Sequence, residues 1–194
     1  EPPQYIFENE ATAKHFAKLR DETDLDTCLL GAAEVASALT GSYLYVTWDK
    51  AVSERPFIAT IAPDSVVPEF KWNKLVAATL WQCVYEDKEK DVYVRLLTRY
   101  EPGYIINALY TGKKKNLGQR TSLTEYFPNL PETQNLPDGL LAIDYVPNMG
   151  PSRLWRKDPR IAPLGRPDYQ GVEPLFAAVD EVMSSWMRDI RLGK

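Results

Sequence analysis

The last segment of the chain constrains the fold most, because its apolar residues recur with the period of an α-helix. From residue 172 to residue 192 they are spaced three or four positions apart, so they would line one side of a helix. They are Val172, Leu175, Phe176, Val179, Val182, Met183, Trp186, Met187 and Ile190. Pro174 fits the first helical turn, and about 20 residues make a helix ~30 Å long. This helix either packs on the core of its own domain, or projects and packs against other subunits.

The preceding residues predict two helices followed by strands. Residues 9–22 and 24–39 have helical periodicity, with Asp24 as the expected cap of the second helix and Gly41 as its end. From residue 42 the pattern becomes typical of strands. The expected strands are residues 43–48, 57–61, 75–85, 92–100, 104–110 and 140–146.

The connections predict how these strands pair. The turn at residues 101–103 and the charged loop at residues 86–91 are short, which favours an antiparallel meander. Nine of the fifteen prolines lie between Pro128 and Pro174, both included, so this stretch is expected to be an extended arm that wraps the sheet. The predicted fold class is therefore α+β: N-terminal helices, antiparallel β meander, proline-rich extended arm and long C-terminal helix.

Composition excludes several classes of protein. The longest uncharged apolar run, near residues 28–33, is far shorter than the ~20 residues that span a membrane, so no membrane segment is expected. The net charge of −4 disfavours a tight, sequence-independent grip on nucleic acid, although DNA could still slide past the surface. Cys28 and Cys83 are expected to be buried free thiols. The chain starts at Glu1 without a readable leader, so we expect the natural start to be missing.

Candidate catalytic or metal-binding residues are sparse. The single histidine, His15, cannot by itself build a multi-histidine metal site, and the cysteines do not have zinc-ligand spacing. The Asp24-Leu25-Asp26-Thr27 run resembles the aspartate-nucleophile motif of haloacid-dehalogenase phosphatases, but follows a helical pattern and is better explained as a helix cap. We therefore expect no catalytic residues, metal or cofactor. The alternative of an enzyme of another type requires a pocket with convergent carboxylates of perturbed pKa.

Two basic groups suggest an alternative function in nucleic-acid binding. Lys113, Lys114 and Lys115 are expected at a hairpin tip, either solvated or touching nucleic acid. The arm carries the second group, Arg153, Arg156, Lys157 and Arg160, with Trp155 between them. These cations could hold a nucleic-acid strand or anchor the arm to an acidic surface. A nucleic-acid-binding α+β module would need both groups on one surface and a steep salt dependence.

Several stretches resemble portal proteins of tailed bacteriophages, particularly those of actinobacterial phages and prophages. Residues 165–172 (GRPDYQGV), followed by Leu175 and residues 178–181 (AVDE), resemble the portal segment that leads into a long helix. The ending at 184–194 (SSWMRDIRLGK) is similar too. Upstream, residues 41–49 (GSYLYVTWD) and 63–69 (PDSVVPE) fit the N-terminal half of that family. The resemblance extends from about residue 32 to residue 194.

This resemblance implies a structural rather than enzymatic role. Portal proteins form a ring of about twelve subunits at one capsid vertex, through which double-stranded DNA is packaged and ejected. Residues 1–171 would form the α+β wing, and residues 172–194 the start of the first stem helix, with clip, returning stem helix, channel loop and crown outside this chain. The implied partners are further copies, terminase, head-completion and capsid proteins, with no membrane. The implied location is the virion, and the host cytoplasm during assembly.

The resemblance also assigns a role to the last helix. Val179, Met183, Trp186 and Ile190 would lie at subunit contacts, because stem helices pack against their neighbours. By itself the chain would form monomers or small, weak oligomers, with non-native contacts along this apolar stripe. A helix whose apolar face is fully covered by its own domain would contradict the interpretation.

Overall fold

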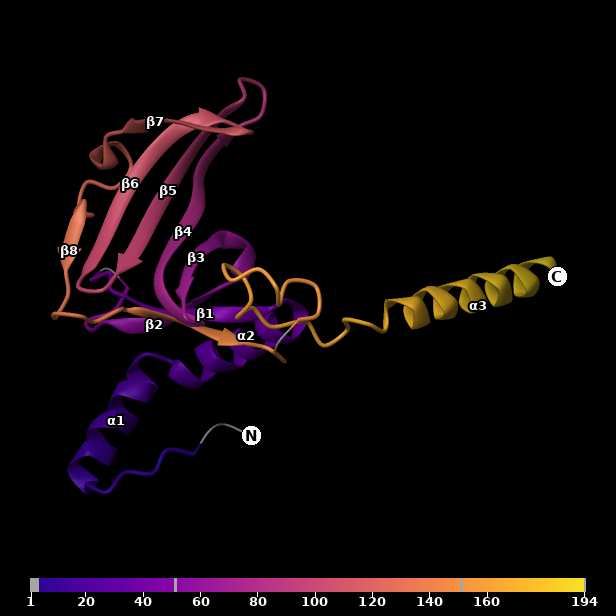
Figure 1. Cartoon of the computed structure of the whole chain (residues 1–194), viewed down its shortest axis with the longest axis horizontal. Coiled ribbons are helices and arrows are strands. Elements are labelled where there is room, and N and C mark those ends of the chain that lie inside the picture. Colours follow the sequence, from indigo (N-terminus) through magenta and orange to yellow (C-terminus); the bar gives the residue numbers. More distant parts are fainter. Residues whose placement is uncertain (1–3, 51, 151, 194) are drawn as a thin grey trace.

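The computed structural model describes residues 4–50, 52–150 and 152–193, and confirms the α+β fold class (Figure 1). The helices are α1 (Glu10–Glu22), α2 (Leu25–Ala38) and α3 (Glu173–Leu192), with short 3-10 turns η1 (Pro63–Ser65) and η2 (Leu123–Glu125). The strands are β1 (Gly41–Thr47), β2 (Phe57–Ile61), β3 (Val66–Lys71), β4 (Lys74–Asp87), β5 (Val92–Glu101), β6 (Tyr104–Lys113), β7 (Asn116–Thr121), β8 (Thr133–Asn135) and β9 (Ile143–Pro147). The predicted helices and meander strands are present with shifted ends.

The N-terminal helices begin and end for local reasons. Asn9 caps α1, since its side-chain oxygen accepts the N–H of Ala11 at 2.8 Å. Asp24 precedes α2, but its carboxylate accepts the hydroxyl of Thr27 at 2.8 Å instead of a backbone N–H, so the expected capping bond is wrong. The prediction that Gly41 ends α2 is also wrong. The helix ends at Ala38, and Gly41 is the first residue of β1.

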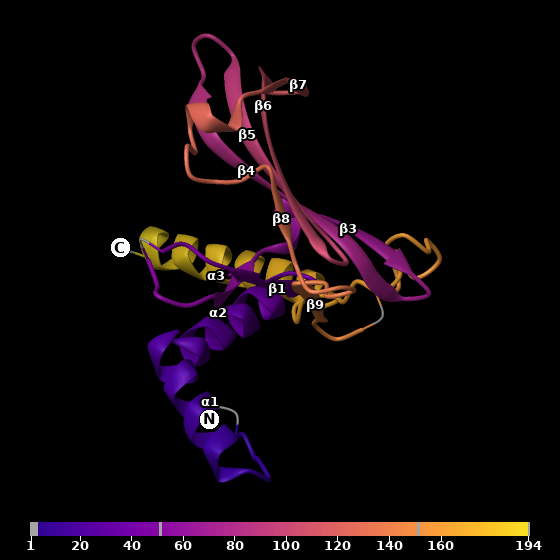
Figure 2. The ribbon, with the colours of Figure 1, turned by 90° about the vertical axis from the view of Figure 1, so that its left-hand side faces the viewer.

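The strands form two antiparallel sheets that meet at the base of the molecule (Figures 1 and 2). The small sheet has the order β2-β1-β9, and the large sheet has the order β3-β4-β5-β6-β7. Strand β8 pairs with residues 104–106 of β6, whereas β7 pairs with residues 109–113. The meander prediction is confirmed for β4, β5 and β6, whose neighbours pair antiparallel. The pairing of β1 with β9 joins residues about a hundred positions apart and closes the small sheet.

Two apolar clusters cover the inner face of the large sheet. At the base, Tyr43 and Tyr145 of the small sheet pack against Ala78, Leu80 and Tyr100 of the large sheet. At the far end, Val94, Leu96, Leu109 and Leu123 form a second cluster, against which Phe127 and Leu130 pack. On β5 the buried face is supplied by the even-numbered Val94, Leu96 and Tyr100, as strand alternation requires. The two sheets are thus fixed to each other around a shared core.

The two cysteines differ in burial from what the sequence predicted. Both are free thiols, as predicted, but Cys83 is exposed on β4 and Cys28 is half-buried on α2, so the predicted burial is wrong. Burial, followed by the nearby charge of Asp24, raises the pKa of Cys28.

In the described residues, no helix combines the length and apolar character that crossing a membrane would take.

Candidate functional site

Helix α3 projects from the domain and is the most unusual surface of the molecule (Figure 1). Gly171, whose φ of 97° suits glycine, turns the chain just before the helix. The carboxylate of Glu173 accepts the N–H of Gly171 at 2.6 Å, and Pro174 lies in the first turn as predicted. A short turn therefore sets the direction of α3.

The base of α3 is held by a hydrogen-bonded anchor, which we define as Thr40, Tyr145, Asn148, Gly165 and Asp168. The Tyr145 hydroxyl donates to the carbonyl of Thr40 at 2.6 Å and accepts the N–H of Gly165 at 3.1 Å. The side-chain nitrogen of Asn148 donates to Asp168 Oδ1 at 2.7 Å, and the N–H of Asp168 donates to the carbonyl of Ser37 at 2.9 Å. Sequence reasoning missed this anchor, because none of these bonds leaves a periodic signal.

The apolar face of α3 is open to solvent. Val179 is 58%, Met183 46%, Trp186 61% and Ile190 49% exposed. These four predicted interface residues share one face, as the spacing requires. The alternative that the helix packs on its own core is wrong, because α3 projects from the domain and contains no buried residue.

The basic arm residues lie beside the base of the large sheet. Arg153, Arg156 and Lys157 are exposed and form no ion pair with any residue that the structure describes. Arg160 differs, since its Nη2 binds Asp158 Oδ2 at 2.7 Å. This hydrogen bond and the backbone N–H of Arg160 lower the pKa of Asp158 to about 2. Trp155 donates its indole N–H to the carbonyl of Leu164 at 3.1 Å, so this hydrogen bond joins two parts of the arm.

The lysine cluster at residues 113–115 lies at the other end of the large sheet. It is the β6–β7 turn, as predicted, where Lys113 pairs with Asn116. Arg95 holds this turn by donating to the carbonyls of Lys113 and Lys114, each at 3.1 Å. Figure 1 shows the turn far from the arm. The two basic groups therefore do not share the surface that the nucleic-acid hypothesis requires.

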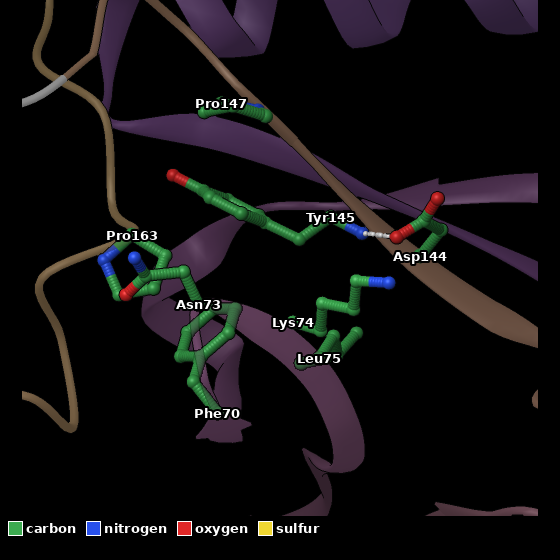
Figure 3. Close-up of a pocket in the computed structure, with 8 residues that line it drawn as sticks. All are labelled: Phe70, Asn73, Lys74, Leu75, Asp144, Tyr145, Pro147 and Pro163. Carbon is green, nitrogen blue, oxygen red and sulfur yellow. Dashed lines mark hydrogen bonds between the residues drawn. The ribbon is translucent and has the colours of Figure 1, made fainter.

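A pocket of about 390 Å³ borders the anchor, between the β3–β4 turn, β9 and the arm (Figure 3). Figure 3 shows Lys74 and Asp144 on one side of this pocket and Asn73 and Pro163 on the other. Tyr145 lines it too, but its hydroxyl is engaged in the anchor. The pocket thus depends on the same contacts that hold the base of α3.

The enzyme hypothesis requires convergent carboxylates with perturbed pKa. Among the described carboxyl groups, Glu69 and Asp158 have a clearly shifted pKa, and both are lowered by an arginine. Arg99 of β5 holds Glu69 of β3 by a side-chain hydrogen bond, whereas Asp158 is bound by Arg160 within the arm. No group of three or more potential metal ligands is assembled among the described residues. Neither Glu69 nor Asp158 lines the pocket of Figure 3.

Comparison with known proteins identifies no relative, since no protein-family model matches the chain and no curated protein is significantly similar to it.

Proposed function

We propose that this chain is a structural subunit of a phage portal ring, located at the capsid vertex through which DNA is packaged and ejected. The observation that supports the proposal most strongly is the exposed apolar face of α3, held at its base by the anchor. The portal-like stretches of sequence lie around these elements, at residues 41–49 and 165–194. In this proposal the α+β domain is the wing and α3 belongs to the stem.

The apolar area exposed on α3 is large enough for a stable contact between subunits. Its nine large apolar side chains, from Val172 to Ile190, are all exposed. Together they present on the order of 1,000 Å² of apolar surface, and a stable interface buries roughly 800 Å² per partner. Monomeric proteins rarely leave a patch of this size in water. Another protein surface is therefore the expected environment of this face.

The charge distribution fits passage of DNA rather than tight binding. The net charge is −4, and the two basic groups lie apart, so together they do not form one continuous basic groove for a duplex. Arg153, Arg156 and Lys157 remain able to make weak phosphate contacts. The proposed protein partners are further copies of the chain, terminase, head-completion proteins and capsid proteins, and the proposed location is the virion.

Electron microscopy of the complete gene product tests the proposal. We expect closed rings in which copies of α3 surround the central axis and the α+β domains form the periphery. Trp186→Glu should abolish ring formation, because it places a charge in the proposed contact. Ala177→Glu, on the polar side of the same helix, should leave the rings intact. Particles without a central channel, or rings with α3 in solvent, would contradict the proposed function.

A further inference from the structure

An open groove interrupts the inner face of the large sheet, between the two apolar clusters. Its volume is about 390 Å³. Thr98 and Tyr100 of β5 form part of its floor, Trp48 and Pro56 line one side, and Leu136 lies after β8. The base cluster and the far cluster each stop at its edge, since Tyr100 belongs to the first and Leu130 packs on the second. The groove is thus an unfilled section of an otherwise covered sheet face.

The chemistry of the groove selects an uncharged occupant. All of the described residues that line it are uncharged, although a quarter of the chain is charged. Its most buried polar group, Asn107, is already satisfied: it accepts from the Thr98 hydroxyl at 3.0 Å and donates to the carbonyl of Pro131 at 2.9 Å. A phosphate or carboxylate would lose its hydration there without gaining a cation. Large apolar side chains would fill the groove without that cost.

We infer that the groove receives the apolar face of α3 from a second copy of the chain. This inference rests on the proposed role of α3 as a subunit contact and gives that contact its partner surface. The stripe on α3 is uncharged, like the groove, and contains large side chains such as Phe176, Met183 and Trp186. When the two surfaces are apart, each exposes apolar area to water, whereas their association removes both areas from water.

The chain's own α3 contributes no residue to the groove, so in this inference the helix that enters it comes from another molecule. Asp168 is bonded to the carbonyl of Ser37 at 2.9 Å and to the side chain of Asn148 at 2.7 Å. Residues 169–172 alone join this point to α3, and they reach at most about 14 Å when fully extended. Figure 1 shows α3 leaving on the side of the molecule opposite β8, which lies next to the groove.

Such a contact is heterologous, because each copy offers a helix on one side and a groove on the other. Repetition of a heterologous contact produces a closed ring when the rotation between copies closes, and an open chain when it does not. Two α3 helices that pack through the same stripe about a two-fold axis would instead make an isologous contact and stop at a dimer. In the first arrangement α3 contacts the groove of a second copy, whereas in the second arrangement α3 contacts another α3.

Photo-crosslinking with a benzophenone amino acid in place of Phe176 distinguishes them. In a mixture of ¹⁵N-labelled and unlabelled protein, we expect intermolecular adducts at residues 45–48 or 130–136. The same amino acid in place of Ala177, on the polar side of α3, should give at least tenfold fewer adducts. Gln82→Lys, which adds a charge to the groove at an exposed position, should also reduce the yield at least tenfold, whereas Gln119→Lys on β7 should not.

The location of the adducts decides between the inference and the proposed function. Adducts between two α3 helices would overturn the groove assignment and leave α3 standing as a subunit contact. Equal yields from the Gln82→Lys and Gln119→Lys variants would overturn the groove assignment as well. Absence of any intermolecular adduct, at concentrations up to hundreds of micromolar, would overturn both the groove assignment and the proposed contact.

Discussion

The hydroxyl of Tyr145 accepts a hydrogen bond from the backbone nitrogen of Gly165 at 3.1 Å, and this bond ties the arm to the small sheet. The same hydroxyl donates to Thr40 at 2.6 Å, so one side chain links β9, the start of β1 and the arm. Because α3 follows this point closely, its direction depends on the anchor. These hydrogen bonds fix the chain segment that precedes α3 to β9 and, through the Tyr145 hydroxyl, to Thr40 just before β1.

Replacement of Tyr145 by phenylalanine should destabilise the protein. The change removes both hydrogen bonds and leaves the buried N–H of Gly165 without its partner, a loss of about 1–3 kcal/mol in the free energy of unfolding. Tyr43→Phe is the matched control. Its hydroxyl is buried without a hydrogen-bond partner among the described residues, so its removal should be neutral or stabilising. Urea denaturation of both variants checks the difference, and an equal loss in the two would contradict the anchor.

Replacement of Gly165 by alanine should destabilise the protein through a steric clash. An added Cβ would lie 1.9 Å from the carbonyl oxygen of Asn148 and 2.4 Å from that of Thr40, so the arm would have to move. We expect a loss of about 2 kcal/mol or more. Gly31→Ala in α2 is the control: its Cβ meets open space, and alanine should stabilise the helix by about 0.5–1 kcal/mol. Thermal unfolding should move in opposite directions for the two variants.

The Asp158 carboxyl should titrate far below the ordinary aspartate pKa of about 3.9. The side-chain hydrogen bond from Arg160 is the main cause of its pKa of about 2, followed by the backbone N–H of Arg160. Because the pKa is lower in the folded state, the pairing stabilises the fold above pH ~4 and is lost as pH falls toward 2. Carbon-13 NMR titration of Arg160→Gln should show the pKa of Asp158 rising, but incompletely, since the backbone bond remains. An unchanged pKa would contradict the assignment.

Local patterns predicted the elements of this fold better than their pairing. The strands of the meander and the turn at residues 101–103 were predictable, because alternation and turn residues act over a few positions. The pairing of Gly41 with Pro147 was not predictable, since the two residues are far apart in sequence and no local pattern selects β9 as the partner of β1. Gly41 resembled a helix end, whereas its role is to approach the Tyr145 ring, whose hydroxyl would lie 2.5 Å from an added Cβ.

The sequence predicted which residues form the apolar face of α3, but not that this face is exposed to solvent. Periodicity placed Val179, Met183, Trp186 and Ile190 on one face, yet the same spacing suits a helix buried on its own domain. Exposure follows from the anchor, which depends on the non-local contacts of Tyr145 and Asn148. The groove on the large sheet was likewise invisible in the sequence, because segments from β1 to β8 assemble it.

Sedimentation equilibrium of the protein and two single variants tests the central claim, that the apolar face of α3 is a contact between copies. We expect weak, concentration-dependent association of the unmodified chain, with the association constant lowered at least tenfold by Trp186→Glu. Ala177→Glu, which adds the same charge to the polar side of α3, should associate like the unmodified chain. Identical behaviour of all three proteins, or a strict monomer at every concentration, would contradict the claim.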